Sequence, residues 1–478
     1  MASWTPEHLA PTTLPNAKSS WASLAEEQRD RASAAVEHLQ ILRSQLPPLF
    51  EKLSRIPDPR RPASIRHKLV VVLVYAILLF VLQFSSRREG NRELSRPGLW
   101  EALRAVFPDL DVQDIPHADT VNRLLERIAP EELERVLLSR VQSLLRHRKL
   151  QALMVRRHYV IAIDGLQKLT RDEPWAAEAL RWRNGQNEQV RYTAHVLEAA
   201  LVSPQGITLP LAAEFCTNGP EQDEAKKQDC EQKAFHRLVA RLKKAFPRLR
   251  MLVVADGLYP NGPIMAQCQR YNWEFMITLP DDKLVSVWAE AEALRSLTPE
   301  NTLATTWGDH QQLFWWVNDI EYRYGDNDRQ RLLLHVVVCA EHWTTLDEHD
   351  EPVDHHARFA WVSSSRLSAK NVVDRCNRAA RHRWDIEEHV LAQKHHGYRA
   401  THAFSWDWNA MRCWHYLMLI ACLLNTLTCY SVGLWAVVCR CGFHGTLLFL
   451  RETYQGPWLL SEHLRTLRDR SPQLRLIV

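Results

Sequence analysis

The sequence predicts a mixed α/β protein in which a helical region precedes a sheet-forming core, and a β-rich segment interrupts that core. Three patterns predict this class. Helical periodicity runs through the first third, short β-branched runs then alternate with amphipathic helices, and alternating strands with polar turns follow. Hydrophobic residues make up 46% of the 478 residues and charged residues 24%, as in globular proteins. The expected segments are 1–155, 156–283, 284–358, 359–430 and 431–478, the last a helical tail.

The first segment, residues 1–155, is expected to be all-helical, with 1–45 as a loosely attached polar arm. Asp119 or Thr120 can cap a helix, and Pro130 ends it and opens the next one.

Basic residues in the first segment gather at 55–68 and 140–157. Such clusters are usually solvated faces, but paired helices with basic edges also suit contact with phosphates. We therefore expect this region to bind DNA. The net charge of +4 neither requires nor excludes a nucleic-acid partner.

The ten cysteines and the N-terminal residues indicate the cellular compartment in which the protein works. The opening residues lack a basic stretch followed by an apolar one, so we expect reduced cysteines and a cytoplasmic protein. Cys439, Cys441 and His444 lie close together, but their spacing is not a zinc pattern, and their role stays open.

The second segment begins with "HYVIAIDG" (158–165), a short apolar run that ends in Asp-Gly and predicts a strand. Two more strands follow, and then residues 221–247 predict a long amphipathic helix. "RLRMLVVADGLYP" (248–260) is a further strand with Asp-Gly at its end. Strands and helices in this order predict a mixed sheet covered by helices.

The third segment, 284–358, reads as strands separated by polar turns. A helical stretch follows it, with Ser368 as a plausible cap and Gly397 as a plausible stop.

Asp164 and Asp256 each follow a predicted buried strand and directly precede glycine. One Asp-Gly is a common turn, whereas two that end apolar strands of one α/β unit are more informative. Carboxylates can hold a pair of Mg²⁺ ions about 4 Å apart for phosphoryl transfer, and such a site needs a third carboxylate.

The stretch "RHRWDIEEHVLAQKHHGY" (381–398) can supply the third carboxylate. On a helix, Arg383, Glu387 and Lys394 fall on one face, since they are four and seven residues apart. Glu387 could bind a metal while the two cations hold phosphates. An ordinary surface ion pair between Arg383 and Glu387 is the alternative.

These residues carry a resemblance to a known family. Arg383, Glu387 and Lys394 match R-x3-E-x6-K, the latter part of the Y-x2-R-x3-E-x6-K signature of bacterial insertion-sequence transposases with a DDE triad. "IAIDG" and "VVADGLY" resemble the first two catalytic segments of that family, and "LSRIPDPRRPASIRHKL" resembles its N-terminal segment. The resemblance spans roughly residues 45–430.

The resemblance implies an RNase H-like catalytic core with a β-rich insertion between the second Asp and the Glu. It implies two Mg²⁺ or Mn²⁺ ions at Asp164, Asp256 and Glu387, which would serve as metal ligands and catalytic residues. The implied activity is cleavage of double-stranded DNA at terminal inverted repeats and transfer of the 3′-OH ends into target DNA. The implied assembly is a homodimer on DNA.

One position departs from the family signature. Its tyrosine would fall at Ala380, and Tyr398 is too far along the helix to replace it. Within the insertion, Trp315 and Trp316 resemble the tryptophan on which some relatives stack a flipped DNA base. Burial in the sheet is the alternative, which we favour for at least one of them.

The neighbours of Glu387 need separate consideration. Glu388 points about 100° away from the Arg383 face, so Glu387 is the better candidate. His389, His395 and His396 flank the helix on mixed faces, and we expect polar surface or phosphate contacts there.

Two other classes of protein remain open. One is a domesticated DNA-binding protein, or an endonuclease that keeps the fold without transposition. The other is a membrane protein, because 69–84 and 414–438 are strongly apolar. We expect no membrane partner, since the first stretch is shorter than the roughly 20 residues of a spanning helix, and the second carries His415 and Asn425.

Overall fold

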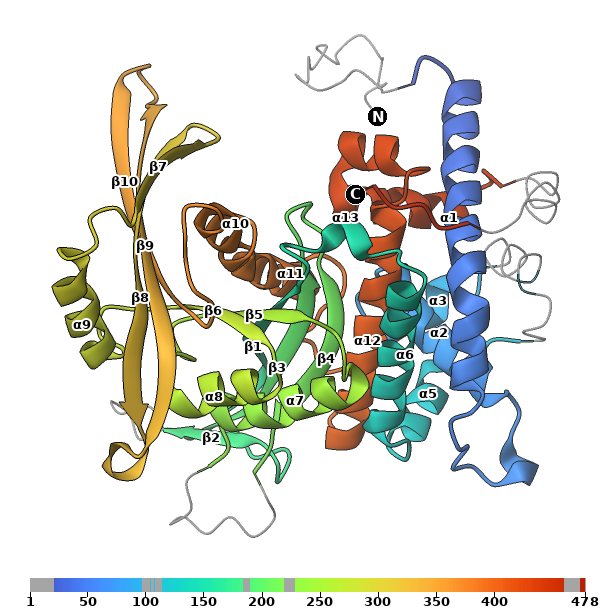
Figure 1. The fold of residues 1–478 in the computed structure, drawn as a ribbon. Helices are drawn as coiled ribbons and strands as arrows, with labels where there is room; N and C mark the ends of the chain where they lie inside the picture. Colours follow the sequence, from blue (N-terminus) through green and yellow to red (C-terminus); the bar gives the residue numbers. More distant parts are fainter. Residues whose placement is uncertain are drawn as a thin grey trace, which may run out of the picture.

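The computed structural model describes residues 21–96, 104, 107, 114–183, 190–218, 228–459 and 473–477 (Figure 1). The start of the expected N-terminal arm and part of the helix expected at 221–247 lie outside these ranges.

The N-terminal region is helical where it is described, as predicted. Its main helices are α1 (Leu24–Leu53), α2 (Leu69–Val81), α3 (Arg87–Glu93), α5 (Ala118–Leu125) and α6 (Pro130–Arg146). The prediction of a loose arm is wrong for α1, because Leu39 and Leu49 are buried and α1 packs against the C-terminal helix α13 (Trp435–Gln455).

Two predicted helix boundaries in this region have different outcomes. Pro130 is the first residue of α6, as expected. Asp119 and Thr120 do not cap α5, because His117 is the N-cap and its ring accepts a hydrogen bond from the Asp119 N–H at 3.2 Å. Histidine is an uncommon N-cap, so the prediction favoured Asp and Thr, which are common ones.

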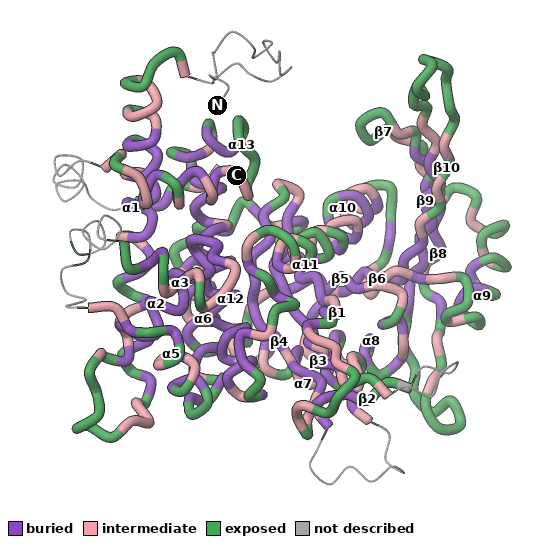
Figure 2. Tube along the Cα trace, turned by 180° about the vertical axis from the view of Figure 1, so that it is seen from behind, coloured by how far each residue is buried: buried purple, intermediate pink, exposed green. Residues whose placement is uncertain are grey.

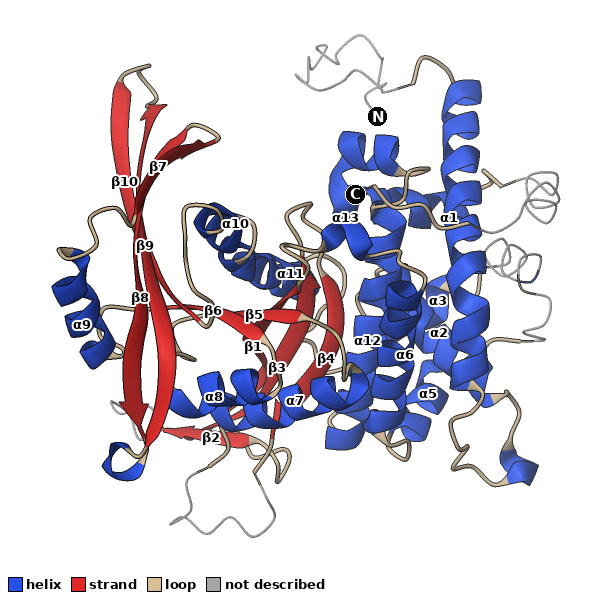
Figure 3. Ribbon diagram, in the orientation of Figure 1, coloured by secondary structure: helices blue, strands red, loops and turns tan. Residues whose placement is uncertain are grey.

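The described strands form one large mixed sheet (Figure 3). Their order is β2-β3-β1-β5-β6-β10-β9-β8-β7, and β4 also pairs with β3. The parallel pairs β1–β5 and β5–β6 lie at the centre, while β1–β3 and β6–β10 are antiparallel. The core strands are β1 (Tyr159–Arg171), β2 (Leu180–Arg183), β3 (Val190–Val202), β4 (Leu209–Cys216), β5 (Met251–Ala255) and β6 (Glu274–Thr278).

Helices cover both faces of the central strands. Ile161 and Ile163 of β1 face the core that contains α7 (Glu231–Ala245) and α8 (Gly262–Arg270). Val160 and Ala162 face the opposite core, since successive side chains of a strand point to opposite faces. By the same alternation, Asp164 lies on the face that carries α10 (Val372–Asn377) and α11 (Trp384–His395).

The β-rich segment continues the central sheet instead of forming a separate one. Its elements are α9 (Val285–Arg295), β7 (Thr302–Trp307), β8 (His310–Tyr324), β9 (Gln330–Leu346) and β10 (Pro352–Ser363). The strands were predicted, whereas α9 was not. The last residues of β10 pair with β6, so the expected boundary at 358 falls inside a strand.

The helical stretch expected after the insertion is broken into three pieces. These are α10 (Val372–Asn377), the 3₁₀ turn Ala380–Arg383 and α11 (Trp384–His395). Gly397 follows α11 with φ of +90°, a conformation that favours glycine, and so it ends the helix as expected. The N-cap of α10 is Asn371 and not Ser368.

Helix α12 (Trp408–Cys429) forms the centre of the helical half and packs against α2, α5, α6 and β4. It is long and apolar enough to cross a membrane by length and composition, but 89% of the residues in its most apolar window are buried within the protein. Figure 2 shows this burial along α12 and the central strands, whereas the tips of β9 and β10 are exposed.

Candidate functional site

The two predicted aspartates lie side by side where β5 ends. In the parallel β1–β5 pair, Ile163 is opposite Ala255, so the next residues along the chain are Asp164 and Asp256. The prediction that the first strand ends at Asp164 is wrong, since β1 continues to Arg171 in its pairing with β3. Asp164 therefore lies within a long strand, and the strand residues before and after it hold its backbone in place.

Backbone hydrogen bonds orient both carboxylates. Asp164 Oδ1 accepts from the Gly165 N–H at 2.9 Å, and Asp256 Oδ1 accepts from the Leu258 N–H at 2.9 Å. Burial raises the pKa of Asp164 to about 6, and the negative charges of Asp256 and Glu387 add to the rise. Burial also raises the pKa of Asp256, with smaller contributions from the negative charges of Glu231 and Glu387.

Helix α11 brings Glu387 to the same place. The 3₁₀ turn before α11 packs against β1 and β5, and α11 itself packs against β1. The buried Arg383 guanidinium donates a hydrogen bond to the Glu387 carboxylate, one helical turn ahead. The Glu387 side chain is 48% exposed.

Arg383 lies among three carboxylates. Its positive charge counteracts the effect of burial on the pKa values of both Asp164 and Asp256, in addition to its hydrogen bond with Glu387. Lys394 is partly buried near the end of α11. The structure thus groups Asp164, Asp256, Glu387 and Arg383, with Lys394 further along the same helix.

The three carboxylates have the oxygen donors of a divalent-metal site. Carboxylate oxygens are the donors that Mg²⁺ and Mn²⁺ prefer, so the chemistry of the donors fits. Among the described residues, however, no three or more His, Cys, Asp or Glu side chains lie together in an arrangement that could hold a metal ion. Arg383 supplies the positive charge beside Glu387 in this structure.

A second polar cluster, which the sequence interpretation missed, adjoins the aspartates. Glu231, the first residue of α7, has one carboxylate oxygen 2.6 Å from His195 Nε2 and accepts a hydrogen bond from Tyr259 at 2.8 Å. Burial acts to raise the pKa of Glu231, but these two partners lower it overall. A Cβ at Gly165 would collide with both Glu231 and His195.

The sequence held partial signals for this cluster. Tyr259 is in the same block as Asp256, and Glu231 opens an amphipathic helix, a frequent place for a carboxylate. Nothing in the sequence indicated that the two side chains meet, because 28 residues separate them.

A buried charge network on another side of α11 also escaped the sequence interpretation. Glu198 is directly opposite Asp164 in the β1–β3 pair and is only 1% exposed. It accepts a hydrogen bond from Gln393 of α11 at 3.0 Å and lies 3.2 Å from His415 Nε2 of α12. The buried Lys168 is near enough for the Glu198 charge to affect its pKa. This network ties α11 and α12 to the sheet.

Trp315 and Trp316 lie on β8 and are 6% and 3% exposed. They point into opposite cores, and the Arg295 guanidinium covers the Trp315 ring at 4.4 Å. The structure therefore places both in the sheet, and neither offers a free ring face to a DNA base.

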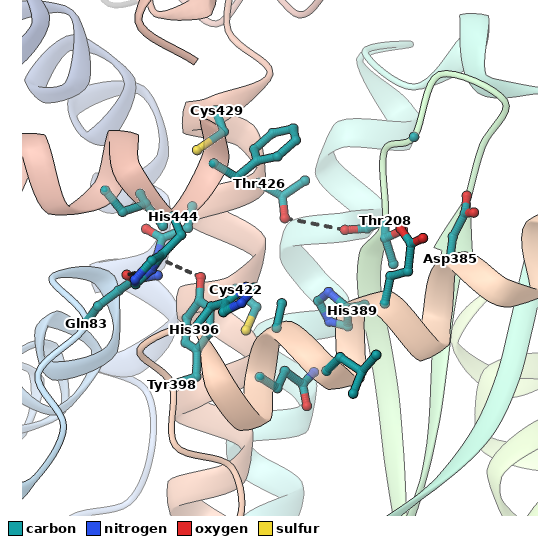
Figure 4. Close-up of a pocket in the computed structure, with 18 of the residues that line it drawn as sticks. Gln83, Thr208, Asp385, His389, His396, Tyr398, Cys422, Thr426, Cys429 and His444 are labelled. Atoms are coloured by element: carbon teal, nitrogen blue, oxygen red, sulfur yellow. Dashed lines mark hydrogen bonds between the residues drawn. The ribbon is translucent and has the colours of Figure 1, made fainter. Parts of the chain in front are cut away.

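Glu388 lies on a different face of α11 from Glu387 and lines a cavity of about 490 Å³ between α11, α12 and α13 (Figure 4). The half-buried His389 and the exposed His396 line the same cavity, and His395 is also exposed. His389 is therefore not the surface residue that we expected.

The cysteine and histidine group of α13 forms no metal cluster within the described chain. His444 instead contacts the Gln83 side-chain oxygen at 2.9 Å, and Cys439 and Cys441 are exposed.

The fold and the site define a mixed α/β protein with a helical N-terminal region and a carboxylate cluster at the end of a parallel strand pair. Residues 50–141 match the family described as DDE_Tnp_1-associated. The matched range runs from the end of α1 into α6, and it associates the chain with DDE_Tnp_1 transposases in general. No curated protein matches the sequence.

Proposed function

We propose that the protein is a DDE transposase of an insertion sequence, which cleaves DNA at the terminal inverted repeats and joins the 3′-OH ends to target DNA. The observation that carries the proposal is the placement of Asp164 and Asp256 side by side where the β1–β5 pairing ends, with Glu387 on α11, which packs against β1. The DDE_Tnp_1-associated match over residues 50–141 supports it independently.

In this proposal the central sheet is an RNase H-like core, and the β7–β10 segment is its insertion. Asp164, Asp256 and Glu387 would hold two Mg²⁺ or Mn²⁺ ions, consistent with their oxygen donors. When bound, such ions activate the attacking hydroxyl and stabilise the leaving 3′-oxygen.

The residues of the chain have their own roles. The strand backbone fixes the two aspartates, and Arg383 positions Glu387 before DNA arrives. Arg383 and Lys394 would hold DNA phosphates beside the carboxylates. Exposed basic residues in the matched region, such as Arg61 and Arg66, would contact the duplex in the same way.

Two further parts of the proposal follow from the reaction. Joining two element ends needs at least two active sites, so we propose a homodimer on DNA. The substrate is chromosomal DNA, so the protein would work in the cytoplasm, at the nucleoid.

The second candidate is a DNA-binding derivative that no longer cuts. The pairing of Arg383 with Glu387 favours it, because the third carboxylate already has a cationic partner. In the transposase, Glu387 must exchange part of this contact for metal binding.

The experiment is cleavage of a plasmid that carries the gene with its flanking DNA, with Mg²⁺ or Mn²⁺ and with EDTA. We expect metal-dependent cuts at both ends by the wild type, loss of cutting in Glu387→Gln, and normal cutting in the matched control Glu388→Gln. Wild-type protein that binds this DNA but never cuts it would favour the derivative. Equal cutting by Glu387→Gln would remove Glu387 from the site.

A further inference from the structure

The cavity between α11, α12 and α13 has no part in the proposed DNA chemistry, yet it has the size of a ligand site (Figure 4). Its volume of about 490 Å³ is within the roughly 300–1,000 Å³ range of small-molecule sites. The rings of Tyr430 and Phe443 line it with their centroids 5.0 Å apart, and Leu391 and Leu447 add apolar surface. The cavity can therefore accept a ligand with an apolar body.

Two buried acceptor atoms of the lining have no hydrogen-bond partner within the described protein. They are Oε1 of Gln393 and Oδ1 of Asn425, and these residues are 0% and 2% exposed. Leaving buried polar atoms unpaired is costly, so in native proteins they are normally satisfied by a ligand or by water.

The opposite end of each amide fixes these two atoms as oxygens. Gln393 Nε2 donates to the Glu198 carboxylate at 3.0 Å, and a flipped amide would place an oxygen against that carboxylate. Asn425 Nδ2 donates to the Val81 carbonyl at 3.2 Å and to the Tyr398 hydroxyl at 2.8 Å. The atoms left for a ligand are therefore carbonyl oxygens, which can only accept a hydrogen bond.

Two hydroxyl groups of the lining already donate their hydrogens within the protein. The Thr426 hydroxyl donates to the Thr208 carbonyl at 3.4 Å, and the Tyr430 hydroxyl donates to the Gly206 carbonyl at 2.6 Å. These donors are thus not free for a ligand, whereas the two amide oxygens are.

The charged side chains of the lining are acidic. Asp385 and Glu388 of α11 line the cavity, and its described lining contains no Lys or Arg. Burial is the main cause that lowers the pKa values of His389 and His444, so these two rings are neutral at neutral pH. Negative charge together with unpaired acceptors favours a ligand that is positively charged and donates hydrogen bonds.

We propose that this cavity binds a small organic cation, an ammonium group on an apolar body, whose N–H groups donate to Asn425 Oδ1 and Gln393 Oε1 and whose body lies against Tyr430 and Phe443. The proposal goes beyond the DNA chemistry and does not depend on it. Aromatic walls suit such a ligand, because a cation is attracted to the face of an aromatic ring. Water alone is the alternative occupant, since water would satisfy the same acceptors without any requirement for charge.

The test is a series of four probes of similar shape, measured by isothermal titration calorimetry on the full-length protein. Phenethylamine has the ring and the ammonium group, and phenethyltrimethylammonium keeps the charge but has no N–H. Phenethyl alcohol is neutral, and phenylpropanoate is an anion. We expect phenethylamine to bind saturably with a dissociation constant of about 1 mM or below. The other three should bind at least about tenfold more weakly, because each lacks the charge-assisted hydrogen bonds.

Two protein changes locate the site. Ala392→Leu places a larger apolar side chain in the cavity at a position of α11 and should abolish phenethylamine binding. Asn425→Leu removes one acceptor and should weaken this binding about tenfold. Ala289→Leu, the same change as the first at an exposed position of α9, is the matched control and should bind like the wild type. Should Asn425→Leu fail to fold, Ala392→Leu and its control still locate the site.

Three results would overturn the proposal. The first is no saturable binding of phenethylamine, which would leave water as the occupant. The second is equal affinity for phenethylamine and any of the other three probes, because the ligand would then need no donating cation. The third is phenethylamine binding that Ala392→Leu leaves intact, since the ligand would then lie elsewhere. DNA cleavage is tested separately by the plasmid assay, so either proposal can fail without the other.

Discussion

The side of helix α11 that carries Glu387 differs from the side that carries Gln393. Glu387 is about half exposed and has one charged partner, Arg383. Gln393 is fully buried and hydrogen-bonds to Glu198, which itself lies between β1 and α12. The buried side has fixed partners, whereas the other side is open to solvent.

This difference indicates how the site is kept in place without a metal. The position of α11 is set by the buried Glu198 network and by apolar residues such as Ile386. In the proposed transposase, Glu387 would therefore exchange Arg383 for a metal without any movement of the helix. Pre-organised ligands on a rigid element are what accurate metal-assisted catalysis needs.

The largest effect is expected for substitutions of the two aspartates, Asp164 and Asp256. Asp164→Asn and Asp256→Asn should each lower the rate of DNA cleavage at least about a thousandfold, because bound metal contributes several kcal/mol of charge stabilisation. DNA binding in EDTA should change less than about threefold, since neither residue supplies positive charge. Single-turnover cleavage and a binding titration check the two parts, and residual cleavage near the wild-type rate in either variant would exclude that aspartate.

A substitution on the buried side of α11 is expected to lower the stability of the protein. Glu198→Ala removes the negative charge from beside the buried Lys168 and His415, so we expect the free energy of unfolding to fall by about 3–5 kcal/mol. Urea unfolding followed by fluorescence measures it. Glu388→Ala, an exposed change on the same helix, is the control and should stay within about 0.5 kcal/mol of the wild type. Equal stability of the two variants would mean that the Glu198 network does not hold α11.

The open side of α11 could be predicted from the sequence and the buried side could not. Arg383 and Glu387 are four residues apart, and helical spacing alone places them together. The pairing of Asp164 with Asp256 followed from two apolar runs that each end in Asp-Gly. Glu198 and Gln393 are 195 residues apart, and no local sequence pattern predicts their contact.

Contacts between residues far apart in the sequence also explain where the predicted fold was wrong. The strands of the insertion were visible as alternating residues, but their continuity with the central sheet depends on the β6–β10 pairing between distant segments. Trp315 and Trp316 were candidates for DNA contact because the sequence does not say which faces of β8 are covered. Both faces are covered, one by each core.

The pH dependence of the metal-free protein tests the burial of Asp164. Its pKa is raised to about 6 in the native state, so between about pH 4 and pH 6 the native state binds more protons than the unfolded state. Stability from this group is therefore lost as the pH rises through that window. In EDTA we expect the wild type to lose roughly 1–2 kcal/mol more than Asp164→Asn between pH 4 and pH 7, after allowance for solvent screening. Parallel stability curves for the two proteins would contradict a raised pKa.

The smallest effect is expected for Lys394, at the far end of α11. Lys394→Ala should weaken DNA binding only a few-fold near 0.15 M salt and reduce the salt slope by about 0.7–0.9, because one phosphate contact is lost. Lys394→Arg should restore the slope, since it keeps the charge. Filter binding at several salt concentrations measures both. If the slope is unchanged in Lys394→Ala, this lysine does not contact phosphate, and the DNA-facing part of α11 ends near Glu387. If the slope falls as expected, the DNA-facing part of α11 extends over the two helical turns between Glu387 and Lys394. The open side of α11 then binds DNA, while its buried side holds the helix against the sheet and α12.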